Sequence, residues 1–256
     1  MKPLPSVSLA LATLALLLSA SCVRHPSATV KVLAAASLVD LMGDVTRAAH
    51  DSGLEVRCSF AASSQARAQI AHGAPADLFV SASIEDARTL VQEGLAEKQT
   101  GVSLYRNHLV VVAPVDGAVR ALDDLRQRGR LALGDPRIVP AGRYAEQSLR
   151  HLDLWSALDG RRVLGADARV VLGWAARGEV DAAVVYETDS RSEATRLRVV
   201  TRLPDDSHAP IVYVAVVPRQ ADNREGAAAV LALMASPRGR EAARAHGFEP
   251  IMEPLP

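Results

Sequence analysis

The stretch Gly134-Asp135-Pro136-Arg137-Ile138-Val139-Pro140-Ala141-Gly142-Arg143-Tyr144-Ala145 indicates a strand, from Leu131 to Gly134, that passes through a short loop into a helix. Pro140 fits the first helical turn, where no backbone donor is needed. Gly142 predicts a helix start that is open to close approach. The free N–H groups and partial positive charge of such a start suit an anion. Because most strand-to-helix turns bind nothing, this interpretation depends on whether the chain repeats the pattern.

The N-terminal part of the chain does repeat it. Val30 to Ala34 is a predicted strand, and Ser37 precedes a predicted helix that runs from Leu38 to about His50. A second strand, Glu55 to Phe60, is followed by Ser63 and a helix over Gln65 to Ala71. Serine is a good N-cap, so Ser37 has two interpretations: it only caps the helix, or it also binds a ligand.

The rest of the chain continues the alternation of strands and helices. Asp77 at the start of one strand is expected to accept backbone hydrogen bonds, and the proline-containing tail from Phe248 is predicted to be irregular. The alternation favours an α/β fold with parallel sheets and helices on both faces. The apolar run Leu109 to Ala113 is typical of a strand buried on both faces. The further strands are predicted at 77–81, 131–134, 161–163, 181–186, 197–200 and 211–217, and the further helices at 84–92, 122–128, 141–152, 169–177, 223–235 and 237–246.

Candidate binding residues share one position in this pattern, just after or at the ends of predicted strands. Ligands of open α/β sheets bind outside the carboxyl ends of the strands. Since no linker of low complexity separates two domains, we expect two similar lobes that the chain crosses more than once. The candidate residues are Ser37, Ser63, Ala141, Ala168 and Tyr186.

Composition excludes several classes of function. The 29 basic residues balance the 29 acidic residues, so there is no basic excess for nucleic acid. The seven histidines show no metal-binding spacing, and neither Gly-x-Ser-x-Gly nor a glycine-rich nucleotide motif is present. What remains is a set of neutral donors: serine hydroxyls, helix-start amides and one tyrosine hydroxyl. Oriented neutral donors can replace the hydration shell of a dianion.

The N-terminus indicates export. Residues 1–21, with the apolar run Leu9 to Leu18, are predicted to be a signal peptide. The run is too short for a transmembrane helix that spans a bilayer. Small residues precede Cys22, as in a bacterial lipobox, although Ser19 stands where a large aliphatic is usual. Two outcomes stay open, lipidation of Cys22 or simple cleavage. If Cys22 is lipidated, Cys58 has no disulfide partner; it is expected to be a buried small hydrophobe.

Several stretches occur in the order of one known family: Ala34-Ala35-Ala36-Ser37-Leu38, Phe60-Ala61-Ala62-Ser63-Ser64 with Gln69-Ile70, Gly73-Ala74-Pro75-Ala76-Asp77-Leu78-Phe79-Val80-Ser81-Ala82, Asn107 with Leu109 to Pro114, Gly134-Asp135-Pro136 with Val139-Pro140-Ala141-Gly142, and Val184-Val185-Tyr186. With them, the chain resembles the periplasmic molybdate-binding proteins, the substrate-binding subunits of ABC transporters. Two features depart from the family pattern: Ala168 replaces a larger aliphatic, and Ala61-Ala62 replaces a turn richer in serine and glycine.

The resemblance implies a two-lobed type II binding-protein fold, α/β in class. Each lobe would be a mostly parallel sheet flanked by helices, with the ligand in the cleft between them. The expected division is lobe 1 over 29–105, lobe 2 over 106–214 and the second part of lobe 1 over 215–256. Carried over from the family, Ser37 and Ser63 bind the oxyanion through hydroxyl and amide, Ala141 and Ala168 through amides, and Tyr186 through its hydroxyl.

The implied function is capture of molybdate, and of tungstate, outside the cytoplasm for uptake through a membrane permease. No enzymatic activity and no cofactor are expected, and molybdenum would be bound only as its oxyanion. The protein is expected to be a monomer that touches the membrane only through a lipid on Cys22. Three alternatives remain: a binding protein for sulfate or phosphate, an exported hydrolase with Ser37 or Ser63 as nucleophile, and a sensor that uses the same fold.

Overall fold

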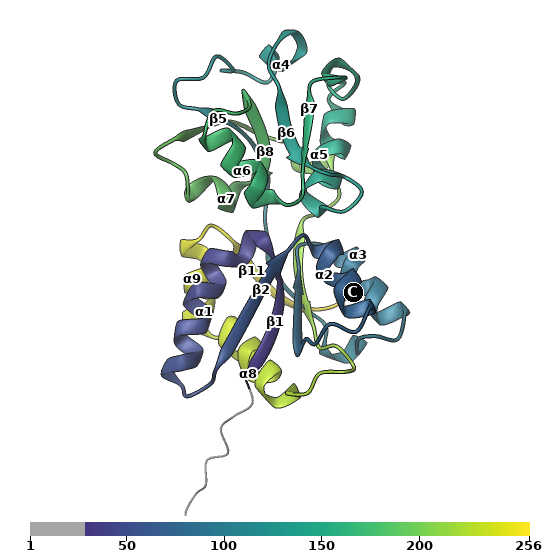
Figure 1. Cartoon of the computed structure of the whole chain (residues 1–256). Coiled ribbons are helices and arrows are strands. Elements are labelled where there is room, and N and C mark those ends of the chain that lie inside the picture. The colour runs from purple at the N-terminus through teal and green to yellow at the C-terminus, as the bar shows by residue number, and fades with distance from the viewer. Residues whose placement is uncertain (1–28) are drawn as a thin grey trace, which may run out of the picture.

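The computed structural model describes residues 29–256, which form two lobes stacked one above the other (Figure 1). The predicted signal peptide and Cys22 lie outside the described residues. The first lobe is built on a six-stranded sheet in the order β11-β4-β10-β3-β1-β2. The second is built on a five-stranded sheet in the order β7-β6-β8-β5-β9. The expected α/β, two-lobed type II architecture is therefore present.

Helices cover both faces of the first sheet. A short 3-10 helix, Ala36–Leu38, leads from β1 into α1, and a second covers Lys98–Thr100. The strands are β1 Val30–Ala35, β2 Val56–Ala61, β3 Leu78–Ser81, β4 Val102–Arg106, β10 Val212–Val216 and β11 Glu249–Pro254, and the helices are α1 Val39–Asp51, α2 Ser63–Ala71, α3 Ile84–Gln92, α8 Arg224–Ala235 and α9 Pro237–Ala245.

The second lobe lies between two crossings of the chain. Its sheet begins after Asn107 and ends before the irregular segment that returns to β10. The first sheet contains all of β10, whereas the boundary expected at 214/215 divides this strand. The strands are β5 Leu109–Pro114, β6 Leu131–Gly134, β7 Arg162–Gly165, β8 Ala182–Tyr186 and β9 Leu197–Arg202; the helices are α4 Asp124–Gln127, α5 Pro140–His151, α6 Ala168–Ala176 and α7 Glu187–Arg191, with 3-10 turns at Ser156–Leu158 and Asp205–Ser207.

Both sheets are mixed. β1 pairs in parallel with β2 and β3, and β6 pairs in parallel with β7 and β8, as expected. The strands that follow a crossing, β5 and β10, instead run antiparallel to their neighbours. The reason is geometric: a chain that arrives from the other lobe enters at the edge where the parallel strands end, so it must run the opposite way.

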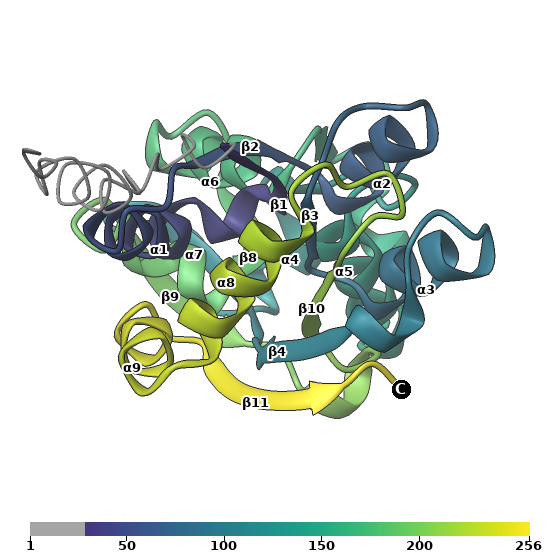
Figure 2. The same ribbon diagram turned by 90° about the horizontal axis from the view of Figure 1, so that it is seen from below.

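The C-terminal tail is a strand, so the prediction of an irregular tail was wrong. β11 pairs antiparallel with β4 at the edge of the first sheet, where Figure 2 shows the two side by side. The register shifts between Pro250 and Glu253. Prolines are tolerated on an edge strand and at a bulge, because no ladder donor is needed there. The sequence interpretation also assigned no element to β4 or to α7.

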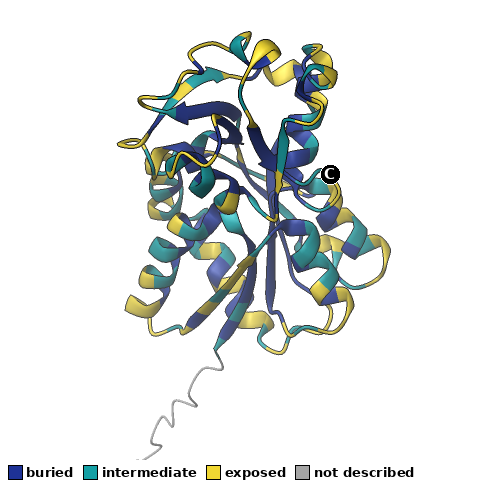
Figure 3. Ribbon diagram, turned by 45° about the horizontal axis from the view of Figure 1, so that its top comes forward, coloured by how far each residue is buried: buried dark blue, intermediate teal, exposed yellow. Residues whose placement is uncertain are grey.

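The core of the described residues consists of three apolar layers, one inside each lobe and one shared by both. One lies between the first sheet and α2 and α3, and another between the second sheet and α6. The third is continuous across the junction of the lobes, where Tyr186 of one sheet meets Tyr213 of the other with ring centroids 5.8 Å apart. The buried strands run through the centre of both lobes in Figure 3. In this structure, the two lobes are therefore in close contact at their junction.

Candidate functional site

A small cavity lies at the junction of the two lobes, where strands of both sheets end at helix starts. The carboxyl ends of β1, β2 and β3 approach it from the first lobe, and those of β6, β7 and β8 from the second. This is the position at which open α/β sheets bind ligands. The lining residues are Ala35, Ala36, Ser37, Ala61, Ala62, Ser63, Ala82, Val139, Pro140, Asp167, Ala168 and Tyr186.

Ser37 and Ser63 reach the cavity from neighbouring strand ends of the first lobe. Ser37 is 4% exposed, and its Oγ lies 2.7 Å from the hydroxyl of Tyr213. Ser63 begins α2, is 1% exposed, and its Oγ accepts a hydrogen bond from the N–H of Ala82 at 2.9 Å. That bond occupies a lone pair of Ser63 and leaves its O–H free to donate.

Tyr186 brings a hydroxyl to the cavity from the end of β8. The residue is 2% exposed, and its hydroxyl has no hydrogen-bond partner among residues 29–256. Burial raises the pKa of Tyr186 well above its ordinary value, so the hydroxyl stays protonated and can donate to a ligand. A buried hydroxyl without a partner costs free energy, which a ligand that accepts from it would recover.

The two alanines stand at helix starts of the second lobe. Ala168 is the first residue of α6 and lines the cavity. Ala141, in the first turn of α5, is buried but is not among the lining residues; its neighbours Val139 and Pro140 are. The structure thus brings together Ser37, Ser63, Ala168 and Tyr186 at the cavity. Ala141 follows the lining residue Pro140 in sequence but does not line the cavity itself.

Glycine is required at position 142 by a contact inside the second lobe. A Cβ on this residue would lie 2.0 Å from the carbonyl oxygen of Gly134, at the end of β6. The close approach that requires glycine is therefore between α5 and its own strand. The glycine seats the start of α5 against the cavity.

Asp167 is the one carboxylate among the lining residues, and the sequence interpretation missed it. It is the N-cap of α6, where its side chain accepts from the N–H of Val170 at 2.9 Å. Aspartate one position before a helix is a recognisable N-cap signal.

Asp77 behaves as expected, since its carboxylate accepts from the N–H groups of Lys31 and Asn223. Cys58 is half-buried against the core, and burial raises the pKa of its thiol.

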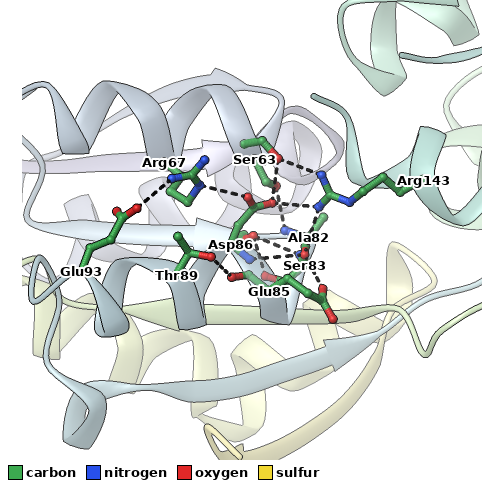
Figure 4. A network of polar contacts seen from close by, with 11 residues as sticks. Ser63, Arg67, Ala82, Ser83, Glu85, Asp86, Thr89, Glu93 and Arg143 are labelled. Atoms are coloured by element: carbon green, nitrogen blue, oxygen red, sulfur yellow. Dashed lines mark hydrogen bonds and ion pairs between the residues drawn. The ribbon is translucent and has the colours of Figure 1, made fainter. Parts of the chain in front are cut away.

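Two arginines of the second lobe bind carboxylates of the first. Arg143 on α5 donates to Asp86 at 3.1 Å and to the hydroxyls of Ser64 and Ser83 (Figure 4). Arg169 on α6 pairs with Asp40 on α1, and within its own lobe with Asp189 at 2.8 Å. Both pairs lie beside helix starts that carry candidate residues, so they hold the two halves of the cavity together.

The site lacks the parts of a serine hydrolase. The hydroxyls of Ser37 and Ser63 contact Tyr213 and a backbone amide, and neither bonds a histidine or a carboxylate. A serine nucleophile needs such a base. Across residues 29–256 there is no group of histidine, cysteine and carboxylate side chains that could hold a metal ion, and no helix long and apolar enough to cross a membrane.

Fold and site together define an extracellular binding protein of the ABC-transporter type rather than an enzyme. Residues 30–249 match the family described as bacterial extracellular solute-binding proteins, and the chain belongs to that family. The molybdate-binding protein ModA of Haemophilus influenzae is 38% identical over 208 residues, which cover 78% of this chain and 82% of the relative.

Solved structures agree with this fold. The periplasmic molybdate-binding protein of Azotobacter vinelandii superposes with a TM-score of 0.78 at 23% identity, covering 86% of this chain and 98% of that one. The sulfate-binding protein SubI of Mycobacterium tuberculosis superposes with a TM-score of 0.76 at 17% identity, covering 87% of each chain. At these identities the likeness concerns the fold.

Proposed function

We propose that this protein captures molybdate outside the cytoplasm and delivers it to the permease of an ABC transporter. The observation that carries the proposal is the cavity between the lobes, which presents buried neutral donors and one unpartnered hydroxyl, that of Tyr186. The similarity to the Haemophilus molybdate-binding protein supports molybdate as the ligand. Tungstate, which has the same charge and shape, is proposed as a second ligand. No cofactor is required.

The proposed binding sequence follows from the division of the site between lobes. In an open form, Ser37 and Ser63 of the first lobe receive the oxyanion. Closure then brings the amides of Ala141 and Ala168 and the hydroxyl of Tyr186 onto the remaining oxygens. Arg143 pairing with Asp86 stabilises the closed form. Closure excludes water, which strengthens each hydrogen bond to the anion, and no bond is made or broken.

Selectivity is proposed to have two origins. The lining hydroxyls and amides act as donors, and the one lining carboxylate, Asp167, is engaged as the N-cap of α6, so the proton of hydrogen phosphate would lack a free partner in the cavity. Cavity size would then separate molybdate from the smaller sulfate. Since the same fold carries a sulfate-binding protein in another organism, the fold by itself does not select the oxyanion. Sulfate is therefore the second candidate.

Attachment to the membrane is proposed through Cys22. Its position after small residues fits a lipobox, and a lipid there would tether the mature, monomeric protein near its permease. Metabolic labelling with a radioactive fatty acid tests this attachment. Label on the wild type and none on a Cys22→Ser variant is the expected result, and an unlabelled wild type contradicts it.

The experiment that tests the proposed function is calorimetric titration of the chain from Ser27 onward with molybdate, tungstate, sulfate and phosphate. We expect saturable heat, with one site per chain, for molybdate and tungstate alone. Binding of sulfate in place of molybdate would overturn the proposed ligand and keep the fold class. Absence of heat with all four would overturn an oxyanion function and direct attention to a different solute.

A further inference from the structure

The hydroxyl of Tyr213 lies next to the site without lining the cavity. Tyr213, on β10, is fully buried, and its ring packs edge-on against Phe248 with centroids 5.2 Å apart. Its hydroxyl is 2.7 Å from Ser37 Oγ and accepts from Asn107 Nδ2 at 3.3 Å. Asn107 stands between β4 and β5, where the chain first crosses to the second lobe.

The donor and acceptor of each hydrogen bond in this network can be assigned by starting from the backbone N–H of His108. The backbone N–H of His108 donates to Asn107 Oδ1 at 2.8 Å, which fixes the orientation of the amide. The amide nitrogen then faces Tyr213 and also donates to Thr188 Oγ1 at 2.9 Å. An amide nitrogen cannot accept. Among the described residues, Ser37 Oγ is therefore the one acceptor within reach of the Tyr213 proton.

We infer that Tyr213, oriented by Asn107, is a positioning residue that makes Ser37 a one-way donor to the oxyanion. Once Ser37 Oγ accepts from Tyr213, its own O–H turns toward the cavity. A hydroxyl free to rotate could donate to one anion or accept from another. The network removes that freedom, so Ser37 is proposed to discriminate against oxyanions that carry a proton. The inference rests on the proposed function and names what sets its selectivity.

The same network joins the two lobes behind the cavity. Thr188 belongs to α7, directly after Tyr186 and Glu187, so Asn107 connects the tyrosine beside Ser37 with the segment that carries Tyr186. The hydroxyls proposed to bind from opposite lobes are thus positioned by one amide. Sequence reasoning missed this because Asn107 and Tyr213 are 106 residues apart and neither lines the cavity.

The test compares two tyrosines on adjacent strands. Tyr213→Phe removes the hydroxyl and keeps the ring. Tyr105→Phe is the matched control, because Tyr105 pairs with Tyr213 across β4 and β10, is equally buried, and has a hydroxyl without a partner in the described chain. We expect Tyr213→Phe to raise the dissociation constant for molybdate about tenfold. Ser37 would lose its fixed orientation, and with it one oriented hydrogen bond to the charged anion. Tyr105→Phe is expected to leave it unchanged.

Two further readouts separate positioning from packing. In a Ser37→Ala background, Tyr213→Phe is expected to have no additional effect on molybdate affinity, because Tyr213 acts through that hydroxyl. The preference for molybdate over hydrogen phosphate is expected to fall in Tyr213→Phe, since Ser37 regains the ability to accept. If Tyr213→Phe does not fold, Asn107→Leu is placed in the same cycle, where the same loss of additivity is expected.

The outcomes distinguish the inference from the proposed function. A wild type that binds no molybdate overturns the proposed function and the inference with it. A wild type that binds, with a Tyr213→Phe variant as tight and as selective as the Tyr105→Phe control, overturns the inference alone. An effect of Tyr213→Phe that persists undiminished in the Ser37→Ala background also overturns it, because Tyr213 would then act by another route.

Discussion

The guanidinium of Arg143 lies 3.1 Å from the carboxylate of Asp86, and the two residues belong to different lobes. Asp86 is nearly buried and also pairs with Arg67 of its own lobe at 3.3 Å. Arg143 follows Ala141 and Gly142 at the start of α5, so the pair joins one wall of the cavity to the other. The pair is therefore expected to stabilise the closed form.

Removing the charge of Arg143 should favour the open form. Arg143→Met keeps much of the side-chain stem and removes the ion pair. For a partly buried pair we expect a loss of about 1 kcal/mol, which is roughly a fivefold rise in the molybdate dissociation constant. Most of the change should appear as faster release, measured by stopped-flow fluorescence. Arg137→Met is the control, since its pair with Asp135 is exposed and lies within one lobe; equal effects of the two variants would contradict a role for Arg143 in closure.

Tyr186→Phe tests the unpartnered hydroxyl. The lost bond to a charged ligand should cost about 1.5–3 kcal/mol, or roughly 10- to 100-fold in affinity. The ligand-free variant should be as stable as the wild type or more so, because its hydroxyl has no partner among residues 29–256. Calorimetric titration and thermal unfolding measure the two effects. Unchanged affinity would remove Tyr186 from the site.

Gly142→Ala tests how α5 is seated. The new methyl group would meet the carbonyl of Gly134 at 2.0 Å, so α5 must shift, at an expected cost of about 2 kcal/mol or more in the free energy of unfolding. Gly43→Ala is the matched control on α1, where the nearest atom, on Arg47, is 3.9 Å away. That variant should gain about 0.5–1 kcal/mol. Urea unfolding compares them, and equal stabilities would show that the contact at Gly142 does not require glycine.

The pair of Arg169 and Asp189 predicts a pH dependence of stability. Burial raises the pKa of Asp189 to about 6, although Arg169 beside it favours the charged form. The folded state then binds more protons than the unfolded state between about pH 4 and pH 6, so stability falls as pH rises through that window. Above it, the folded protein holds a buried charge whose main compensation is Arg169.

Arg169→Met should therefore destabilise the protein more at pH 8 than at pH 5. At pH 8 an uncompensated buried carboxylate costs about 3–5 kcal/mol, whereas at pH 5 Asp189 can be protonated instead. Urea unfolding of the ligand-free protein at the two pH values measures the difference. Arg177→Met, which breaks an exposed pair with Glu179, should have a small effect at both. A penalty for Arg169→Met that is independent of pH would contradict a buried charge at Asp189.

Local sequence patterns predict many helices and strands of this fold but little of the long-range pairing between strands. The apolar spacing of α1 and the exact bounds of β6 could be predicted, because each depends on neighbours in sequence. The strand β11 was missed because its prolines read as breakers, and only its place at a sheet edge makes them tolerable. The direction of β5 was missed because it depends on which lobe the chain comes from.

The site divides in the same way. Ser37, Ser63 and Ala168 could be placed because they follow strands, and strand ends meet at one edge. The contact of Arg143 with Asp86 depends on how two lobes close, and that of Asn107 with Tyr213 on two separate crossings. Neither leaves a periodic signal in the sequence. Asp167 could have been found, since aspartate before a helix is a standard N-cap.

The central claim is that the oxyanion lies between the lobes and is held by neutral donors. Crystals of the wild-type protein grown with molybdate, and measured at the molybdenum absorption edge, test it most directly. The account predicts one strong anomalous peak in the cavity, with oxygens of the anion within hydrogen-bond distance of the hydroxyls of Ser37, Ser63 and Tyr186. A peak elsewhere on the protein, or an anion held by a positively charged side chain in place of these hydroxyls, would contradict it.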